Sequence, residues 1–215
     1  MINLLLYFII TVILLSLSCC KNSKNDDHAN TGSRKENKDF IREIPQDEKG
    51  DSFFYTIFKD ASAKLKLQDI DNGFDSLMLR IWYPERVQQY MVQIANTSGK
   101  WEAELYIYEE SYSETEADRI RNVQIRKLQP KSGWAQFTDE LFTLGITTLP
   151  DMESIPNYPG IGADGNGYHV EVATIDKYRF YSHSEIIDLD IDEAQKMVKI
   201  MNLLNYEFEI EGNWF

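Results

Sequence analysis

Two histidines and a glutamate in the last third of the chain are the side chains best suited to metal chemistry. His169 and Glu171 alternate with apolar residues in one predicted strand, and His183 follows in the next. If Val172 pairs with Phe180, the two histidines lie opposite each other with Glu171 on the same face. That set would suffice for zinc, with one position left for water. A register shifted by one residue would separate the histidines, and in either register the three could form the solvated face of an edge hairpin.

Other patterns that suggest chemistry lack the context that the chemistry needs. Residues 160–165 have the spacing Gly-x-Gly-x-x-Gly, but a proline-rich loop precedes them and a strand follows, where a dinucleotide site needs a strand and then a helix. Residues 69–75 carry spaced acids without the glycine and glutamate of a calcium loop, so a turn is the better account. Glu102 and Glu104 form a carboxylate pair of the kind used in glycoside hydrolysis, without a feature that distinguishes it. We predict no catalytic residue and no cofactor.

Hydrophobic spacing predicts the elements that would position these residues. Helical spacing occurs over three segments, residues 52–65, 132–145 and 190–204. Strand patterns occur over residues 77–83, 89–95, 100–108 and 119–128, and then over a hairpin of residues 168–174 and 178–182. Short connections favour antiparallel pairing. The expected fold class is α+β, an antiparallel sheet of about six strands packed against two or three helices.

The N-terminus reads as a targeting segment. Residues 1–18 contain no charged side chain, and their apolar run is shorter than the roughly 20 residues of a membrane span. The ending Leu15-Ser16-Leu17-Ser18-Cys19-Cys20 resembles the lipobox of bacterial lipoproteins, in which cleavage precedes a cysteine that carries lipid. The resemblance implies lipidation of Cys19, with Cys20 as the alternative. An uncleaved N-terminal membrane anchor is the competing interpretation, and it also places the rest of the chain outside the cytoplasm.

The chain then divides into three predicted parts. Residues 1–18 are the signal peptide, residues 19–50 are the lipidated cysteine with a disordered polar tether, and residues 51–215 are a single α+β domain. Lys24-Asn25-Asp26-Asp27 is similar to short signals that send some bacteroidete-type lipoproteins to the cell surface, although an ordinary solvated linker is the alternative. The FDSLMLRIWY strand and the GADGNGYHVEV hairpin resemble uncharacterised lipoproteins of bacteroidete type, a resemblance that brings no known activity.

Charge limits the partners. The net charge of −13, with 35 acidic against 22 basic residues, excludes nucleic acid as a probable ligand class because such a chain repels phosphates. The expectation is a cell-envelope protein, held at the outer membrane through its lipidated cysteine and facing the periplasm or the cell surface. It would bind a protein or glycan partner without catalysis. The alternatives are an extracytoplasmic hydrolase, and an inhibitor or immunity-type protein whose acidic surface covers a basic partner.

Overall fold

The computed structural model describes residues 39–48, 50–83, 88–110, 120–158, 167–184 and 190–210. All of them belong to one compact unit, residues 37–215. The predicted signal peptide, Cys19, Cys20 and the glycine-rich segment 160–165 lie outside the described residues. Within the described ranges, no helix is both long enough and apolar enough to span a bilayer.

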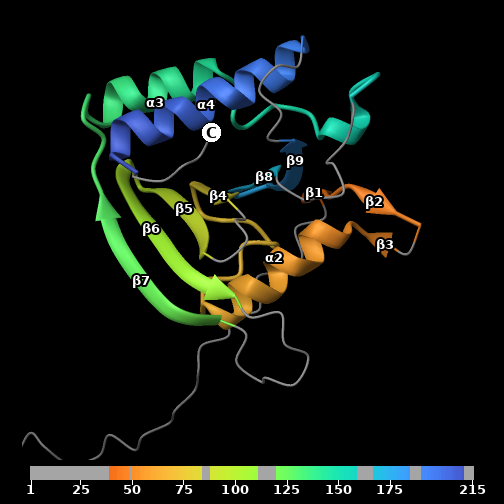
Figure 1. The fold of residues 1–215 in the computed structure, drawn as a ribbon, viewed down its shortest axis with the longest axis horizontal. Helices are drawn as coiled ribbons and strands as arrows, with labels where there is room; N and C mark the ends of the chain where they lie inside the picture. The colour runs from red at the N-terminus through yellow and green to blue at the C-terminus, as the bar shows by residue number, and fades with distance from the viewer. Residues whose placement is uncertain are drawn as a thin grey trace, which may run out of the picture. The chain divides into compact units, whose positions relative to one another are not determined.

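The described residues form a seven-stranded sheet of order β1-β9-β8-β4-β5-β6-β7, a two-stranded ribbon β2-β3 and three α-helices (Figure 1). The helices are α2 (Phe53–Lys64), α3 (Trp134–Thr143) and α4 (Asp192–Phe208), with a short 3₁₀ helix at Met152–Ser154. The strands are β1 (Ile41–Glu43), β2 (Gln46–Asp47), β3 (Gly50–Asp51), β4 (Leu77–Tyr83), β5 (Gln88–Thr97), β6 (Lys100–Glu110), β7 (Ile120–Leu128), β8 (Gly167–Thr174) and β9 (Lys177–Ser184). Neighbours pair antiparallel except β1 and β9, which are parallel. The mixed helix and sheet composition is confirmed, with one strand more in the main sheet than expected.

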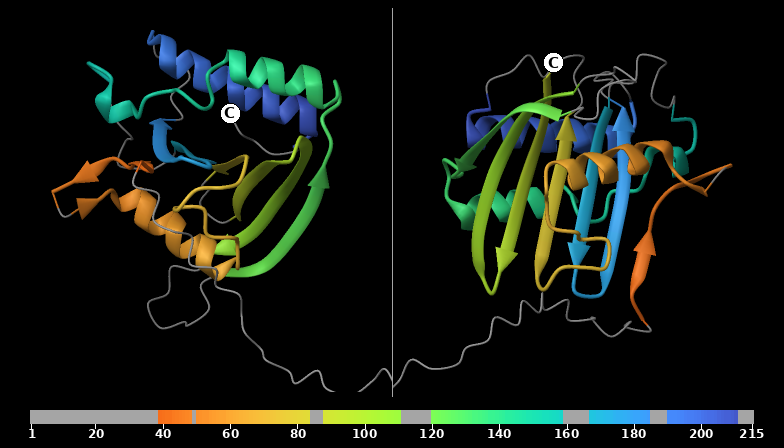
Figure 2. Two further views of the ribbon diagram at one scale, coloured as in Figure 1. Left: turned by 180° about the vertical axis from the view of Figure 1, so that it is seen from behind. Right: turned by 90° about the horizontal axis from the view of Figure 1, so that it is seen from below.

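Helices cover both faces of the sheet. Helices α3 and α4 lie on one face, and α2 lies on the other (Figures 1 and 2). On β4, Leu79 and Ile81 belong to the core under α3 and α4, whereas Met78 and Trp82 belong to the core under α2. Because alternate side chains of a strand point to opposite faces, each central strand contributes to two separate cores.

Helix α2 forms where its hydrophobic spacing predicts it. Ser52 caps the helix, and its Oγ accepts a hydrogen bond from the backbone N–H of Tyr55 at 3.3 Å. Tyr55, Phe58, Ala61 and Ser62 are the buried residues of the helix, and their spacing puts them on one side of it. Three of them pack on the sheet as expected for a core stripe, and the fourth brings a hydroxyl group into the same layer.

The β8–β9 hairpin has the register that separates the histidines. His169 pairs with Ser182 and not with His183, so the favoured register was wrong and the two imidazoles lie on opposite faces. That register assumed a single apolar face for the hairpin. Instead, Val172 packs in the core under α3 and α4, while Phe180 packs in the core under α2. Hydrophobic pattern fixes register best where one face is buried and the other is exposed, and both faces of these two strands are largely buried.

The sheet also includes a strand that the sequence analysis assigned to the tether. In β1, Ile41 pairs with Lys177, so the folded unit begins upstream of residue 51. Phe40 and Ile44 pack against the core under α2. A Cβ at Gly73, where φ is +91°, would lie 2.8 Å from the Phe40 ring, so glycine leaves room for this contact. Phe40, Ile41 and Ile44 stand among many polar residues, and this pattern is too weak to predict a strand of three residues.

Candidate functional site: a polar pocket between helix α2 and the sheet

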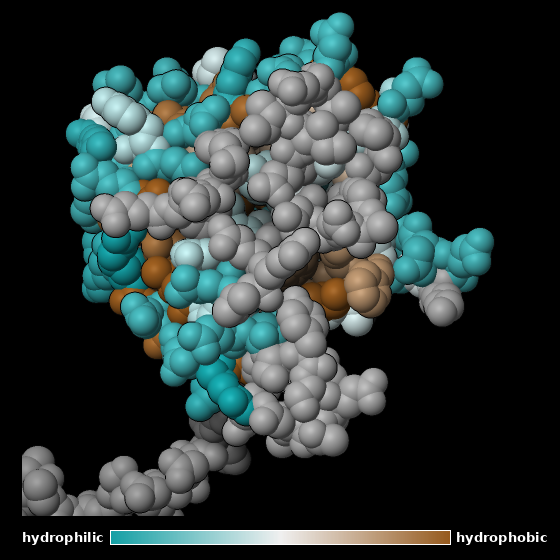
Figure 3. Space-filling view, viewed as in Figure 1, coloured by the Kyte–Doolittle hydropathy of each residue, from teal (hydrophilic) through white to brown (hydrophobic). Residues whose placement is uncertain are grey.

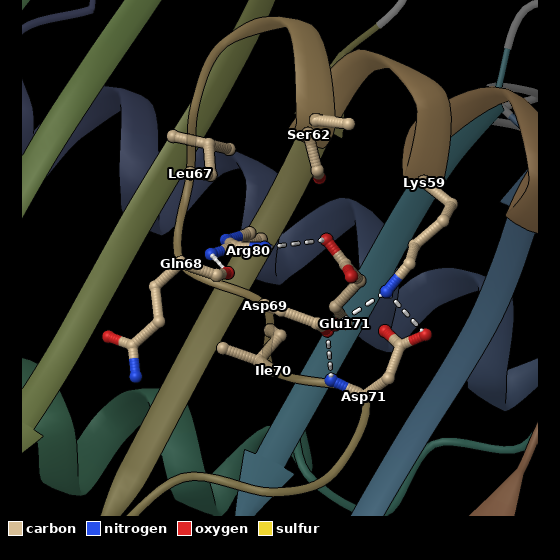
Figure 4. Close-up of a pocket in the computed structure, with 10 residues that line it drawn as sticks. Lys59, Ser62, Leu67, Gln68, Asp69, Ile70, Asp71, Arg80 and Glu171 are labelled. Atoms are coloured by element: carbon tan, nitrogen blue, oxygen red, sulfur yellow. Dashed lines mark hydrogen bonds and ion pairs between the residues drawn. The ribbon is translucent and has the colours of Figure 1, made fainter. Parts of the chain in front are cut away.

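A cavity of about 190 Å³ lies between α2, the loop that follows it and strands β4 and β8 (Figure 4). Its polar lining comes from α2, from the loop and from the sheet, and comprises Lys59, Ser62, Gln68, Asp69, Asp71, Arg80 and Glu171. Aliphatic side chains, including Leu67 and Ile70, complete the wall. The pocket therefore combines charged groups, a hydroxyl and apolar surface in a volume suited to a small molecule.

The floor of the pocket is a buried ion pair. Arg80 on β4 and Glu171 on β8 are register partners, and their exposed fractions are 1% and 3%. Arg80 Nε donates to Gln93 Oε1 at 2.9 Å, and Nη2 donates to the backbone oxygen of Gln68 at 2.6 Å. Nη1 approaches Glu171 Oε2 only to 3.9 Å, which is longer than a hydrogen bond. This third nitrogen therefore keeps donor capacity at the cavity.

The carboxylate of Glu171 is held by two neutral donors. Trp82 Nε1 donates to Oε2 at 2.8 Å, and the Tyr178 hydroxyl donates to Oε1 at 2.9 Å. Burial raises the pKa of Glu171, while the charge of Arg80 and these two hydrogen bonds oppose the rise. Burial and the neighbouring Glu171 carboxylate also raise the pKa of Tyr178, so this phenol stays a donor. Glu171 thus has both oxygens occupied and one fixed orientation.

A second charged group forms the rim. Lys59 Nζ lies 2.6 Å from Asp71 Oδ2 and 2.9 Å from Asp69 Oδ1. Burial alone would lower the pKa of Lys59, but its hydrogen bonds to the two aspartates raise it. The backbone N–H of Asp71 donates to Asp69 Oδ1 at 3.0 Å, which closes a turn. The segment 69–75 is therefore a turn before β4 with a lysine between its first two carboxylates.

The rim is also tied to the first strand of the unit. The Tyr55 hydroxyl donates to Asp71 Oδ2, and Arg42 Nη2 donates to the Tyr55 hydroxyl at 2.7 Å. Arg42 also lies over the Tyr55 ring, 5.3 Å from its centroid. Burial and the Asp71 hydrogen bond raise the pKa of Tyr55 and keep the phenol protonated. The position of Asp71 is therefore fixed by Tyr55 of α2, which is itself held by Arg42 of β1.

Ser62 is the group in the pocket without a protein partner. Its exposed fraction is 8%, and its Oγ makes no hydrogen bond within the described part of the chain. Figure 4 shows this hydroxyl directed from α2 toward Arg80 and Glu171. A buried hydroxyl without a partner costs about 1–3 kcal/mol, so its presence at a cavity requires a reason.

His169 lies on the α2 side of the sheet, among aromatic rings. Its ring centroid is 4.5 Å from that of Phe54 and 4.7 Å from that of Phe58. Nδ1 is 2.8 Å from Ser182 Oγ, while Nε2 is buried and has no partner among the described residues. Burial lowers the pKa of His169 to about 3, so this imidazole is neutral and serves as a core residue.

His183 lies on the opposite side of the sheet. Its Nε2 donates to the backbone oxygen of Pro150 at 2.9 Å, and burial lowers its pKa to about 4. The predicted zinc ligands His169, Glu171 and His183 are therefore not brought together, because the register places the imidazoles on different faces. Among the described residues, no group of three or more His, Cys, Asp or Glu side chains is arranged to hold a metal ion.

The glutamate pair on β6 makes local contacts. Glu102 forms an ion pair with Lys100, and Glu104 Oε2 accepts a hydrogen bond from the Tyr106 hydroxyl at 2.9 Å. These partners lie two residues along the same strand, and the pair lines no part of the pocket between α2 and the sheet. Neither carboxylate is set against a second catalytic group by these contacts.

Sequence reasoning missed most of the pocket, although one signal was present. Arg80 interrupts the apolar strand Leu77–Tyr83, and Glu171 interrupts the apolar strand Gly167–Thr174. A single charge inside a strand that is otherwise buried needs an opposite charge nearby. Two such strands, one with a buried positive charge and one with a buried negative charge, predict a buried ion pair if the strands are neighbours in the sheet. Ser62 and Lys59 carried no comparable signal.

The comparisons with known proteins leave the function to be argued from this geometry. The chain has no significant match to any protein-family model, to any curated protein or to any solved structure. The residues of the pocket are therefore the main basis for a functional proposal.

Proposed function

We propose that this protein is a lipid-anchored cell-envelope protein that binds a small polar ligand, without transforming it, in the pocket between α2 and the sheet. The observation that carries the binding proposal is Ser62, whose buried hydroxyl faces the cavity without a partner in the described residues. Beside it, Arg80 is buried with one nitrogen beyond hydrogen-bond reach of Glu171. A ligand that contacts both groups would recover the free energy that their burial costs.

Binding is favoured over catalysis because the candidate acids and bases are already engaged. Both oxygens of Glu171 accept hydrogen bonds from Trp82 and Tyr178. Asp71 is held by Tyr55 and Lys59. A general base must reach the proton of a substrate, and a nucleophile needs an adjacent base to activate it. These contacts support a preformed binding site more than a reaction centre.

The location rests on the N-terminal sequence. The uncharged apolar run that ends in Ser18-Cys19-Cys20 supports a lipid anchor at Cys19, or at Cys20, in the envelope. The polar segment after these cysteines would act as a linker between the membrane and the folded unit. In the view of Figure 3, the surface over helices α3 and α4 is mainly hydrophilic, as expected for helices exposed to water. The outer membrane, with the domain on its periplasmic or outer side, is the proposed place.

The binding proposal is tested by native mass spectrometry of the full-length chain, purified from the membranes of its natural host in mild detergent. We expect a retained small molecule in the wild type and its loss in Ser62→Leu, because the larger side chain fills the cavity. Ser154→Ala, which alters an exposed serine, is the matched control. No retained mass, or equal retention in Ser62→Leu, would contradict the proposal.

The anchor is tested on the same material. The N-terminal peptide of the mature chain should carry lipid on its first cysteine, and Cys19→Ala should block processing. If neither Cys19→Ala nor Cys20→Ala alters processing or partition into detergent, the anchor proposal is wrong.

A further inference from the structure

The charges around the pocket restrict the ligand that it can take. Two cations, Lys59 and Arg80, stand among three carboxylates, Asp69, Asp71 and Glu171. An anionic ligand would have to displace a carboxylate from Lys59 or Arg80, since each of these cations already faces one. A cationic ligand would have to displace Lys59, which lies 2.6 Å from Asp71 and 2.9 Å from Asp69. Ligands with a net charge of either sign are therefore disfavoured.

The hydrogen-bonding capacity left in the pocket comes from one hydroxyl group and one guanidinium nitrogen. Ser62 Oγ is both a donor and an acceptor, and no described residue uses either capacity. Arg80 Nη1 offers a donor that stays 3.9 Å from Glu171. A ligand hydroxyl complements both groups, since it can accept from Arg80 and exchange a hydrogen bond with Ser62. The aliphatic side chains of Leu67 and Ile70 provide surface for C–H groups.

The volume sets the size of the ligand. A cavity of about 190 Å³ has room for several water molecules. One small ring or a short open chain fits inside such a space, and a longer chain would have to extend out of it. Resting on the proposed function, we infer that the ligand is a neutral, hydroxyl-rich small molecule, a polyol or single sugar, which hydrogen-bonds to Ser62 Oγ and Arg80 Nη1.

The experiment compares neutral and charged probes on the full-length protein. The protein is held in a detergent without a sugar head group, and any molecule carried through purification is first removed by exchange. The neutral probes are myo-inositol and D-glucose, the zwitterion is glycine and the anion is inorganic phosphate. Binding is followed by saturation-transfer NMR and quantified by titration. We expect at least one neutral probe to bind at least tenfold more tightly than glycine or phosphate.

Substitutions locate the binding. Ser62→Ala removes one neutral hydrogen bond and should raise the dissociation constant of the neutral probe about three- to tenfold. Ser62→Leu should abolish binding, and Ser154→Ala should leave it unchanged. Thermal unfolding followed by circular dichroism confirms that each variant is folded. Since Ser62 lies on a helix and faces a cavity, both substitutions are compatible with the fold.

Each outcome decides between the two proposals. Tighter binding of a neutral probe that depends on Ser62 supports the inference. Ser62-dependent binding of glycine or phosphate instead overturns the ligand class and leaves the binding function in place. If no probe binds while native mass spectrometry shows a retained molecule of another class, the inference fails alone. If no molecule is retained and no probe binds, both proposals fail.

Discussion

The two faces of the sheet are both covered by helices, but the side chains buried on them differ in chemistry. The core under α3 and α4 is assembled from aliphatic and aromatic residues such as Leu79, Ile81 and Leu204. The core under α2 contains aromatic rings too, but it also encloses the Arg80–Glu171 pair. The first face also buries single polar side chains such as His183 and Glu207, whereas the second encloses two opposite charges that burial removes from water.

The difference indicates where function resides. An ion pair in the interior contributes little net stability compared with apolar residues of similar volume, because desolvation offsets the attraction. Within the described residues, the core under α3 and α4 shows that this chain can fill one face of the sheet without a fully buried ion pair. We therefore attribute the polar groups under α2 to ligand binding, and the apolar core to stability. Substitutions on the two faces should separate these roles.

The largest expected effect comes from breaking the buried pair. Glu171→Leu leaves the Arg80 guanidinium buried without its counter-charge and leaves the Trp82 and Tyr178 donors without an acceptor. We expect a loss of about 3–5 kcal/mol in the free energy of unfolding, measured by urea denaturation.

A double variant isolates the charge effect. Arg80→Met with Glu171→Leu removes both charges, so it should be more stable than Glu171→Leu alone while still failing to bind ligand. If the losses of the two single variants simply add in the double variant, the two side chains do not interact and the account of the pocket floor is wrong.

A substitution on the other face should lower stability without altering binding. Leu204 on α4 is fully buried, and Leu204→Ala should cost about 2–4 kcal/mol through lost burial and the cavity it leaves. The affinity for the retained ligand, measured under conditions where the variant is folded, should match that of the wild type. A tenfold weaker affinity would show that the two faces are not functionally separate.

Acid should destabilise both faces through their buried histidines. The pKa is about 3 for His169 and about 4 for His183, against 6.5 for the ordinary imidazole. Below pH 6.5 the histidines of the unfolded chain therefore bind protons, whereas those of the folded chain stay neutral. The free energy of unfolding falls as the pH drops toward 4. Each histidine should account for about 2 kcal/mol at pH 5, relative to pH 7.

Two variants assign this pH dependence to the faces. His169→Phe, on the α2 side, should flatten the fall in unfolding free energy between pH 6.5 and 4, and His183→Gln should do the same on the other side. The raised pKa of Glu171 acts in the opposite sense and is common to both variants. An unchanged slope in His169→Phe would contradict the burial assigned to this ring.

The smallest effect is expected at the edge of the α2 side. Arg42→Ala removes the hydrogen bond from β1 to Tyr55, and because Arg42 is partly exposed the loss should be about 1 kcal/mol or less. Deleting residues 24–36, upstream of the folded unit, should change the free energy of unfolding by no more than about 0.5 kcal/mol. A larger loss in that deletion, measured by thermal unfolding, would show that the folded unit extends further toward the N-terminus.

Sequence patterns predicted the elements well where one period dominates. Helix α2 was expected over residues 52–65 and spans Phe53–Lys64, and the strand expected over residues 77–83 spans Leu77–Tyr83. Spacing of apolar residues every three or four positions, or in a continuous run, reflects burial directly. The class of the fold followed from these elements.

The pairing of the elements was harder to predict, and the pocket depends on pairing. Strands β8 and β9 are largely buried on both faces, so no solvent-exposed face fixed their register. The predicted meeting of His169 with His183 did not occur. Arg80 meets Glu171 because β4 lies beside β8, far along the chain. Such long-range neighbours are set by tertiary packing, which local periodicity does not encode.

The most direct test of the account is to map ligand contacts onto the two faces. Backbone amide NMR signals of the full-length protein are recorded while myo-inositol is added. We expect shifts in α2, in the loop of residues 67–71 and around Arg80 and Glu171, while the signals of α3 and α4 stay nearly unchanged. Shifts that concentrate on α3 and α4, or that persist in Ser62→Leu, would contradict the assignment of binding to the α2 face.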